Sequence, residues 1–329
     1  MNGRRQLIAI VVVTGLAALA GPIGIVACNR ATPGADARPR VGLVLKTLNS
    51  PFFIDMQRGA EEAAARLNVD LVVQAADREI DVERQMQIIE NLIQARVGAL
   101  AITPSGSREV VPAIGKANAG NIPVVIVDTR LDAKAAADGG VKIVSFIGSD
   151  NFRGGQLIGE YLVKASAGTS KAAILEGIPG HETGDSRIKG FKDAIRNTPG
   201  IVIVASQPGN WERDQGFSVF QNILQAHPDV DTVFACNDVM ALGAIEAIAA
   251  AGKTGKIRVL GFDAIQDARR ALEAGTMAAT VAQFPEEMGR VAVENAVKAL
   301  RGEAVPAETG VRIELVTRET ATPKETRTQ

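Results

Sequence analysis

From Val41 onward, short runs of apolar and β-branched residues alternate with longer segments of helical periodicity. The apolar runs are nearly continuous rather than alternating with polar residues, which is typical of strands buried on both faces of a parallel sheet. The predicted strands are Val41–Leu45, Leu71–Gln74, Ala99–Ile102, Val124–Val127, Ile143–Ile147, Ala172–Leu175, Val202–Ala205, Thr232–Ala235, Arg258–Gly261, Ala278–Val281 and Arg312–Val316. The predicted helices between them are Ile54–Leu67, Val82–Ala95, Val110–Ala119, Gly154–Ala165, Arg187–Asn197, Arg213–Ala226, Met240–Ala251, Gln266–Ala274 and Glu286–Leu300.

This alternation of strands and helices predicts an α/β protein with doubly wound parallel sheets. The predicted strands are too many for one open sheet, so we expect two sheets in two domains. The length of 329 residues agrees with this, at a prior of about 150 residues for each domain. A TIM barrel is the competing layout, but it requires eight regular strand–helix units and fits the pattern poorly.

The first 28 residues have the pattern of a secretory signal. Arg4 and Arg5 precede an uncharged, mainly apolar run from Leu7 to Ala20. The run Ile25-Val26-Ala27-Cys28 resembles a bacterial lipobox, in which the cysteine is lipidated and becomes the mature N-terminus. We therefore expect lipidation at Cys28.

Two other interpretations of this segment stay open: a cleaved signal without lipid, and an uncleaved membrane anchor. Residues 7–28 carry no charge and are long enough to span a bilayer, although Pro22 argues against one continuous helix. Residues 29–40 are rich in Pro, Arg, Ala and Gly and indicate a linker, and the polar residues 320–329 indicate a frayed tail.

The composition excludes several classes of function. Lys and Arg total 36 against 37 Asp and Glu, without the basic excess that is typical of nucleic-acid-binding proteins. The chain has only two cysteines and two histidines, too few for a thiolate or imidazole metal cluster. We expect no metal and no cofactor. Cys236 ends an apolar run, which indicates a small buried core residue.

Polar and aromatic residues follow most of the predicted strands. Ligands of open α/β sheets bind outside the carboxyl ends of the strands, so these residues predict a binding site. Aromatic rings can stack on the apolar C–H face of a sugar, and Asp, Arg, Asn and Gln can pair with its hydroxyls. A buried hydroxyl left unpaired costs about 1–3 kcal/mol, so a sugar site needs many such partners. The pattern therefore favours sugar binding.

Each of these residues also has a structural interpretation. Phe52 and Phe53 could be core residues at the start of a helix, but two adjacent rings point in different directions on a helix. Trp211 lies in a polar context that suits a ligand better than a core. Of the pair Asn237-Asp238, we assign Asp238 mainly to capping the next helix and Asn237 to the ligand.

Signs of enzymatic chemistry are weak. The glycine-rich loop 177–184 lacks the Lys-Ser/Thr ending of a phosphate-binding loop. His181, within that loop, has no Ser or Cys partner motif, and we expect an exposed loop residue. Asp128 and Asp263 could form a carboxylate pair for glycoside hydrolysis, but the amides and rings around them suit holding a sugar better than cleaving it. We expect no enzyme.

Several segments together resemble the ribose-binding protein group of periplasmic sugar-binding proteins, within the LacI-like periplasmic-binding family. The resemblance runs from Val41 to about Val316. Its most specific segments are Thr47-Leu48-Asn49-Ser50-Pro51-Phe52-Phe53, Ser149-Asp150-Asn151, Ala205-Ser206-Gln207-Pro208, Ala226-His227-Pro228-Asp229-Val230, Asn237-Asp238-Val239-Met240-Ala241-Leu242-Gly243, Gly261-Phe262-Asp263 and Ala279-Thr280-Val281-Ala282-Gln283.

The resemblance implies two lobes that are joined by three crossovers and close over one sugar. The implied N-terminal lobe is 41–149 plus 284–311, and the C-terminal lobe is 150–283 plus 312–319. By the resemblance, Phe52, Phe53 and Trp211 stack on the sugar ring. The full implied binding set is Ser50, Phe52, Phe53, Thr103, Asp128, Arg130, Arg187, Trp211, Asn237, Phe262, Asp263 and Gln283.

The chain also departs from the ribose-binding pattern. Ribose binders typically carry Asn where this chain has Ser50 and Thr103, and Arg where it has Thr129; Arg130 follows one residue later. Trp211 replaces a smaller Phe. These departures leave another pentose, a hexose or a polyol as plausible as ribose.

The resemblance implies the solute-binding protein of an ABC-type sugar importer, which acts by hinge closure on the ligand. Its partners would be the sugar and a permease in the inner membrane. The protein would be a monomer, exported to the periplasm or cell envelope and held at the membrane only by a lipid or N-terminal anchor. The alternative is a sugar-sensing partner of a membrane chemoreceptor or kinase. Related repressors have a helix-turn-helix where this chain has its signal segment, which argues against DNA binding.

Overall fold

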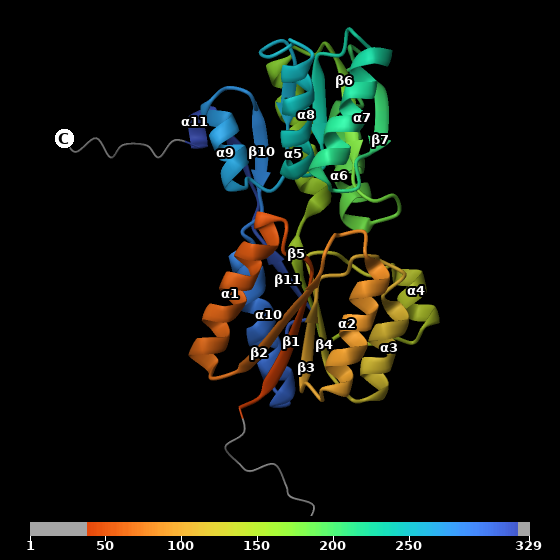
Figure 1. Ribbon diagram of the computed structural model, residues 1–329, viewed down its shortest axis with the longest axis vertical. Coiled ribbons are helices and arrows are strands. Elements are labelled where there is room, and N and C mark those ends of the chain that lie inside the picture. Colours follow the sequence, from red (N-terminus) through yellow and green to blue (C-terminus); the bar gives the residue numbers. More distant parts are fainter. Residues whose placement is uncertain (1–37, 322–329) are drawn as a thin grey trace, which may run out of the picture. The chain divides into compact units, whose positions relative to one another are not determined.

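The computed structural model describes residues 38–321, and the predicted signal segment, Cys28 and most of the tail lie outside them. The described chain forms two six-stranded sheets (Figure 1). The first has the strand order β11-β5-β4-β3-β1-β2, and every neighbouring pair is parallel. Its strands are β1 (Arg40–Thr47), β2 (Asp70–Ala76), β3 (Ala99–Ile102), β4 (Val124–Val127), β5 (Ser145–Ser149) and β11 (Glu308–Val311).

The second sheet has the strand order β12-β10-β9-β8-β6-β7. All its pairs are parallel except β12, which runs antiparallel to β10 at the edge. Its strands are β6 (Ser170–Glu176), β7 (Ile201–Pro208), β8 (Thr232–Ala235), β9 (Arg258–Leu260), β10 (Ala279–Ala282) and β12 (Glu314–Thr317). The predicted doubly wound α/β architecture with two parallel sheets is confirmed.

Helices cover both faces of each sheet, as continuously apolar strands require. In the first sheet, α1 packs against α10 and α2 against α3, and Figure 1 shows these pairs on opposite sides of the strands. In the second, α5 packs against α6 and α7 against α8. The helices are α1 (Pro51–Leu67), α2 (Val82–Gln94), α3 (Val111–Ala119), α4 (Ala133–Asp138), α5 (Asn151–Ala165), α6 (Glu182–Ile195), α7 (Arg213–Ala226), α8 (Asp238–Ala250), α9 (Gln266–Glu273), α10 (Pro285–Leu300) and α11 (Arg318–Ala321).

The chain passes between the two sheets at three places. After β5, the carboxylate of Asp150 accepts a hydrogen bond from the backbone N–H of Arg153 at 2.8 Å and so caps α5. After β10, Phe284 adopts a left-handed backbone conformation (φ 58°) immediately before Pro285 opens α10. The third passage joins β11 to β12.

The elements that the pattern did not predict are short and poorly buried. β11 is an edge strand that is mostly exposed, so it has no apolar run. α4 contains no buried residue and therefore has no hydrophobic periodicity. The predicted strand 143–147 lies two residues later, at 145–149, and the last predicted strand begins at Glu314 rather than Arg312. Within residues 38–321, no helix has both the length and the apolar character needed to cross a membrane.

Candidate functional site

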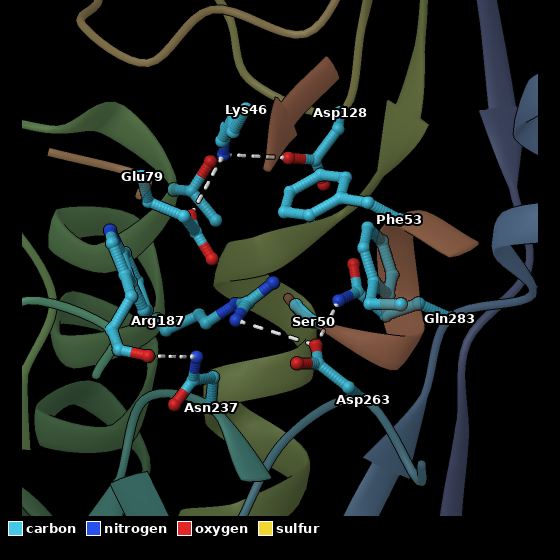
Figure 2. Close-up of a pocket in the computed structure, with 12 residues that line it drawn as sticks. Lys46, Ser50, Phe53, Glu79, Asp128, Arg187, Asn237, Asp263 and Gln283 are labelled. Atoms are coloured by element: carbon cyan, nitrogen blue, oxygen red, sulfur yellow. Dashed lines mark hydrogen bonds and ion pairs between the residues drawn. The ribbon is translucent and has the colours of Figure 1, made fainter. Parts of the chain in front are cut away.

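A cavity of about 290 Å³ lies where the carboxyl-terminal ends of strands from both sheets meet (Figure 2). Its walls combine three aromatic rings with carboxylates, amides and two cationic side chains. It is lined by Lys46, Ser50, Phe52, Phe53, Glu79, Asp128, Thr183, Arg187, Trp211, Asn237, Asp263 and Gln283. Nine of the residues singled out in the sequence are thus brought together here, as expected from parallel sheets that place their strand ends at one edge.

Two of the rings come from the first turn of α1. Pro51 occupies the first helical position, and the rings of Phe52 and Phe53 meet edge to face with centroids 5.2 Å apart. Both side chains are buried and also contribute to the hydrophobic core. Phe52 and Phe53 therefore line the cavity and also belong to the hydrophobic core.

The third ring, Trp211, approaches the cavity from the second sheet. Its indole packs directly on Gly177, where a Cβ atom would lie only 1.9 Å from the ring, so any larger residue at 177 would displace it. His181 meets the indole edge-on, with centroids 5.8 Å apart. The buried indole Nε1 has no hydrogen-bond partner among the described residues. Because Trp211 lines the cavity, this N–H is a candidate donor to a ligand.

Arg187 is a buried cation held in one orientation. Its Nε donates to Asn151 Oδ1 at 2.9 Å, its Nη1 donates to the carbonyl of Cys236, and Nη1 lies 3.7 Å from Asp263 Oδ1. The guanidinium stacks over the Phe262 ring at 3.7 Å from the centroid. These contacts leave N–H groups of the fork free for a ligand.

Close packing of α5 on α6 places this arginine. A Cβ atom at Gly155 would lie 2.0 Å from the carbonyl oxygen of Arg187, so glycine allows the two helices to approach at this point. Helix α5 therefore contacts both the backbone of Arg187, through Gly155, and its side chain, through Asn151.

Asp263 and Gln283 lie next to each other in the wall of the cavity (Figure 2). Gln283 Nε2 donates to Asp263 Oδ1 at 2.6 Å. Burial raises the pKa of the Asp263 carboxyl, and Arg187 opposes this effect. The buried Oε1 of Gln283 has no partner among the described residues and is available as an acceptor.

The roles that we assigned to Asn237 and Asp238 are wrong in part. Asn237 is itself the cap of α8: its Oδ1 accepts from the backbone N–H of Met240 at 2.8 Å, while its side chain also lines the cavity. Asp238 is fully buried and accepts from Thr280 Oγ1 at 2.7 Å and from the backbone N–H of Ile265 at 3.0 Å. Asp238 therefore ties three chain segments together.

Lys46, Glu79 and Thr183 line the cavity although the sequence analysis did not single them out. Lys46 Nζ donates to Asp128 Oδ2 at 2.9 Å and to Thr129 Oγ1 at 2.8 Å, and it lies 3.9 Å from the Glu79 carboxylate. Burial raises the pKa of Glu79 to about 8, only partly opposed by Lys46. Burial also disfavours a charged Asp128, but Lys46 and Arg187 hold its pKa below the usual value.

Three predicted residues lie outside the cavity lining. Thr103 turns its hydroxyl to the carbonyl of Val44, at 3.2 Å. Arg130 stacks over Phe146 and pairs with Glu308 at the surface. Phe262 is fully buried beneath the guanidinium of Arg187, which separates it from the cavity.

His181 is not the exposed loop residue that we expected. It is 2% exposed and stands at the N-cap of α6, with its Nε2 3.3 Å from the carbonyl oxygen of Pro104 in the other sheet's loops. Burial lowers the pKa of His181 to about 3, so the ring is neutral. Nearby, the hydroxyls of Thr129 and Thr183 are 2.9 Å apart. The N-cap and first turn of α6 therefore contact the first sheet's loops at several points.

Two of the three missed cavity residues, Lys46 and Glu79, stand where the predicted strand ends were slightly misplaced, whereas Thr183 lies in the first turn of α6. β1 extends through Thr47, so Lys46 is still part of the strand rather than of the turn after it. β2 extends to Ala76, two residues beyond its predicted end, and Glu79 lies in the loop that follows. Reading the residues after every observed strand end would have found Glu79.

This arrangement is suited to holding a polyhydroxylated molecule. The rings offer apolar faces, and the carboxylates, amides and cations offer hydrogen bonds that are charge-assisted. In the part of the chain that the structure describes, no group of three or more His, Cys, Asp or Glu residues is placed to bind a metal ion.

Comparison with known proteins gives consistent similarities. The family model for the periplasmic binding protein domain matches residues 41–304. The ribose import binding protein RbsB of Escherichia coli K12 is 38% identical over 285 residues, covering 87% of this chain and 93% of that protein. The D-allose-binding periplasmic protein of the same strain is 34% identical over 284 residues, covering 86% and 91%.

Solved structures agree with these relatives. The crystal structure of a periplasmic solute-binding protein of an ABC transporter from Actinobacillus succinogenes 130z, with bound D-allose, superposes with a TM-score of 0.80. The two chains are 39% identical, and the match covers 86% of this chain and 99% of that one.

Proposed function

This chain belongs to the periplasmic binding protein family, and from that premise we propose that it is the extracytoplasmic solute-binding protein of an ABC-type sugar importer. The observation that carries this proposal is the cavity between the two sheets, in which three rings surround a set of buried hydrogen-bonding groups. The relatives named above are described as binding ribose or D-allose, which agrees with this chemistry.

We propose a monosaccharide, either a pentose, a hexose or a polyol, as the ligand. The empty space of about 290 Å³ between the lining side chains favours a single sugar unit over an oligosaccharide. Phe52, Phe53 and Trp211 would stack on its faces. Asp128, Arg187, Asn237, Asp263 and Gln283 would bind its hydroxyls, together with Ser50, Lys46, Glu79 and Thr183.

The mechanism is closure of two lobes over the sugar, with residues 41–149 plus 284–311 in one lobe and 150–283 plus 312–319 in the other. Three contacts between the lobes support a closed state. Thr129 contacts Thr183, and His181 contacts the carbonyl of Pro104. The backbone N–H of Glu182 donates to the hydroxyl of Ser107 at 3.2 Å. Opening would break them. A bound sugar would add contacts to both lobes and so favour closure.

The same groups explain why we propose binding without turnover. Asp128 is committed to Lys46, and Asp263 to Gln283 and Arg187, so neither carboxyl is positioned as a free acid or base. The sugar would be released unchanged to the permease. Recovery of the bound sugar without chemical change, by mass spectrometry after incubation, checks this point.

Calorimetric titration with D-ribose, D-allose, D-arabinose and myo-inositol tests the proposal. We expect one or more of these compounds to bind with a stoichiometry of one. Trp211→Ala should weaken binding strongly, whereas Arg130→Ala, which lies outside the cavity, should not. Absence of binding by every compound, with folding verified by circular dichroism, would refute sugar recognition.

We further propose that Cys28 is lipidated and that the protein is a monomer held at the membrane by this lipid. Cys28 lies outside the described residues, so the proposal rests on the lipobox-like run before it. Labelling of growing cells with a radioactive fatty acid should mark the wild-type protein and leave Cys28→Ala unmarked.

Reconstitution with the cognate permease tests the role in transport and should show sugar-dependent ATP hydrolysis. A protein that serves only a sensory partner would give none.

A further inference from the structure

Glu79 is the one carboxylate of the cavity wall that accepts no hydrogen bond from another residue within 38–321. It is 7% exposed, and its only charged contact is Lys46 Nζ at 3.9 Å. Asp128 and Asp263 both accept short hydrogen bonds. Because Glu79 lines the cavity and accepts no hydrogen bond from the described residues, its carboxyl group is available to a group of the ligand.

The distance between Lys46 and Glu79 limits the size of the ligand group that can lie between them. A separation of 3.9 Å is too long for a direct hydrogen bond. One oxygen atom at about 2.8 Å from both groups would fit the gap, with an angle of roughly 90° at that oxygen. Figure 2 shows both side chains turned toward the same part of the cavity. The gap therefore matches a single bridging atom.

Lys46 still has a donor for this atom. An ammonium group carries three N–H donors, and two of them are used by Asp128 and Thr129. The third can donate to the bridging atom, which must at the same time donate to Glu79 when that carboxyl is ionised. A hydroxyl can do both. An ether oxygen or a fluorine can only accept, an ammonium can only donate, and a carboxylate can only accept.

We propose that Lys46 and Glu79 form a specificity-determining pair that binds one free hydroxyl of a neutral sugar as a bridge between them. This inference rests on the proposed sugar-binding function and narrows it. The pair would reject amino sugars and acidic sugars that carry their charged group at this position, because each would place a like charge or an unpaired group in a buried site.

The charges around Glu79 support this assignment. Lys46 lowers its pKa, whereas Asp128, Asp263 and Glu212 raise it, in addition to the larger effect of burial. A hydroxyl that donates to the carboxylate favours the charged form. The sugar would thus stabilise Glu79 where the protein alone does so poorly.

The test is a titration series with deoxy and fluorodeoxy derivatives of whichever sugar in the panel above binds tightest, carried out above the Glu79 pKa of about 8 so that the carboxyl is ionised. For wild type we expect one ring position at which both the deoxy and the fluorodeoxy derivatives bind about 10- to 100-fold more weakly, since hydrogen bonds to charged groups are lost. The amino derivative at that position should bind at least as poorly. In Glu79→Ala, the parent and the deoxy derivative should differ by less than about threefold.

The outcomes separate this inference from the proposed function. If wild type binds the parent sugar but no position is sensitive to both substitutions, or if Glu79→Ala retains the full discrimination, the pair does not bind a bridging hydroxyl. Arg130→Ala is the matched control and should discriminate like wild type. If Glu79→Ala does not fold, the wild-type series together with Glu79→Gln decides the matter, because an amide keeps the shape but can weaken a charge-assisted bond. Failure of all sugars to bind wild type would instead refute the proposed function.

Discussion

The ion pair between Lys46 and Asp128 allows a quantitative prediction. Both side chains are less than 5% exposed, and the charged atoms are 2.9 Å apart. At an effective dielectric constant of about 20, their attraction is about 6 kcal/mol, much of which offsets the cost of removing both charges from water. Asp128→Asn keeps the size of the side chain but leaves the ammonium of Lys46 without its nearest counter-charge.

Removing one partner of a buried pair typically costs about 3–5 kcal/mol. Glu79 remains near Lys46 and can take over part of the role of Asp128, so we expect Asp128→Asn to lower the free energy of unfolding by about 2–3 kcal/mol. Lys46→Met should remove the unpaired cation. The double variant Asp128→Asn/Lys46→Met should therefore be more stable than the summed effects of the two single variants predict, by at least about 1 kcal/mol.

Urea unfolding of the ligand-free protein at pH 7, followed by Trp211 fluorescence and by far-ultraviolet circular dichroism, measures these values. Asp70→Asn is the matched control, because Asp70 pairs with Arg40 at the surface and its loss should cost less than about 1 kcal/mol. A loss of less than about 0.5 kcal/mol for Asp128→Asn, or strictly additive effects in the double variant, would contradict the argument.

Three further predictions concern ligand binding. Gly177→Ala should displace the indole that packs on it and weaken sugar binding more than about tenfold, while Gly115→Ala, with open space around it, should not; equal affinities would refute this. A sugar that stabilises charged Glu79 lowers its pKa from about 8, so binding should release a proton and tighten as the pH rises from 6 to 8, measured by calorimetry in two buffers. An affinity that does not change between pH 6 and pH 8 would refute this. Arg78→Ala removes a half-exposed ion pair to Glu212 across the cleft and should weaken binding less than about fivefold, an effect that added salt should mask.

The fold could be predicted largely because its strands are buried on both faces. Strands such as β3, β4, β8 and β10 are buried at every position, and a run of β-branched and apolar residues is the direct consequence. The pattern failed where this constraint is absent. The edge strand β11 and the surface helix α4 bury too little to select apolar residues. Backbone pairing with β5 defines β11, and the Asp132 cap marks the start of α4.

Cavity residues could be predicted where side chains that follow a strand end point into the cavity. The prediction was wrong where a side chain near a strand end points elsewhere. Thr103 directly follows β3, but its hydroxyl donates to the carbonyl of Val44 in the neighbouring strand β1. Phe262 follows β9 as expected, yet its ring packs against the guanidinium of Arg187 and does not line the cavity. Sequence position gives the end of the sheet at which a residue lies, and the packing of its neighbours determines which way it turns.

The departures from the ribose-binding pattern gain a physical explanation in Lys46. The sequence has Thr129 where ribose binders typically carry Arg, which suggested a site with fewer cationic donors. The structure shows that a cation is supplied from β1 instead: the Lys46 ammonium binds both Asp128 and the hydroxyl of Thr129. An ammonium is a compact charge with three donors, whereas a guanidinium is a planar fork. The cavity therefore keeps a buried cation beside Asp128 but gives it a different shape and a third neighbour, Glu79. We therefore expect this compact cation between Asp128, Thr129 and Glu79 to contribute to the choice of sugar.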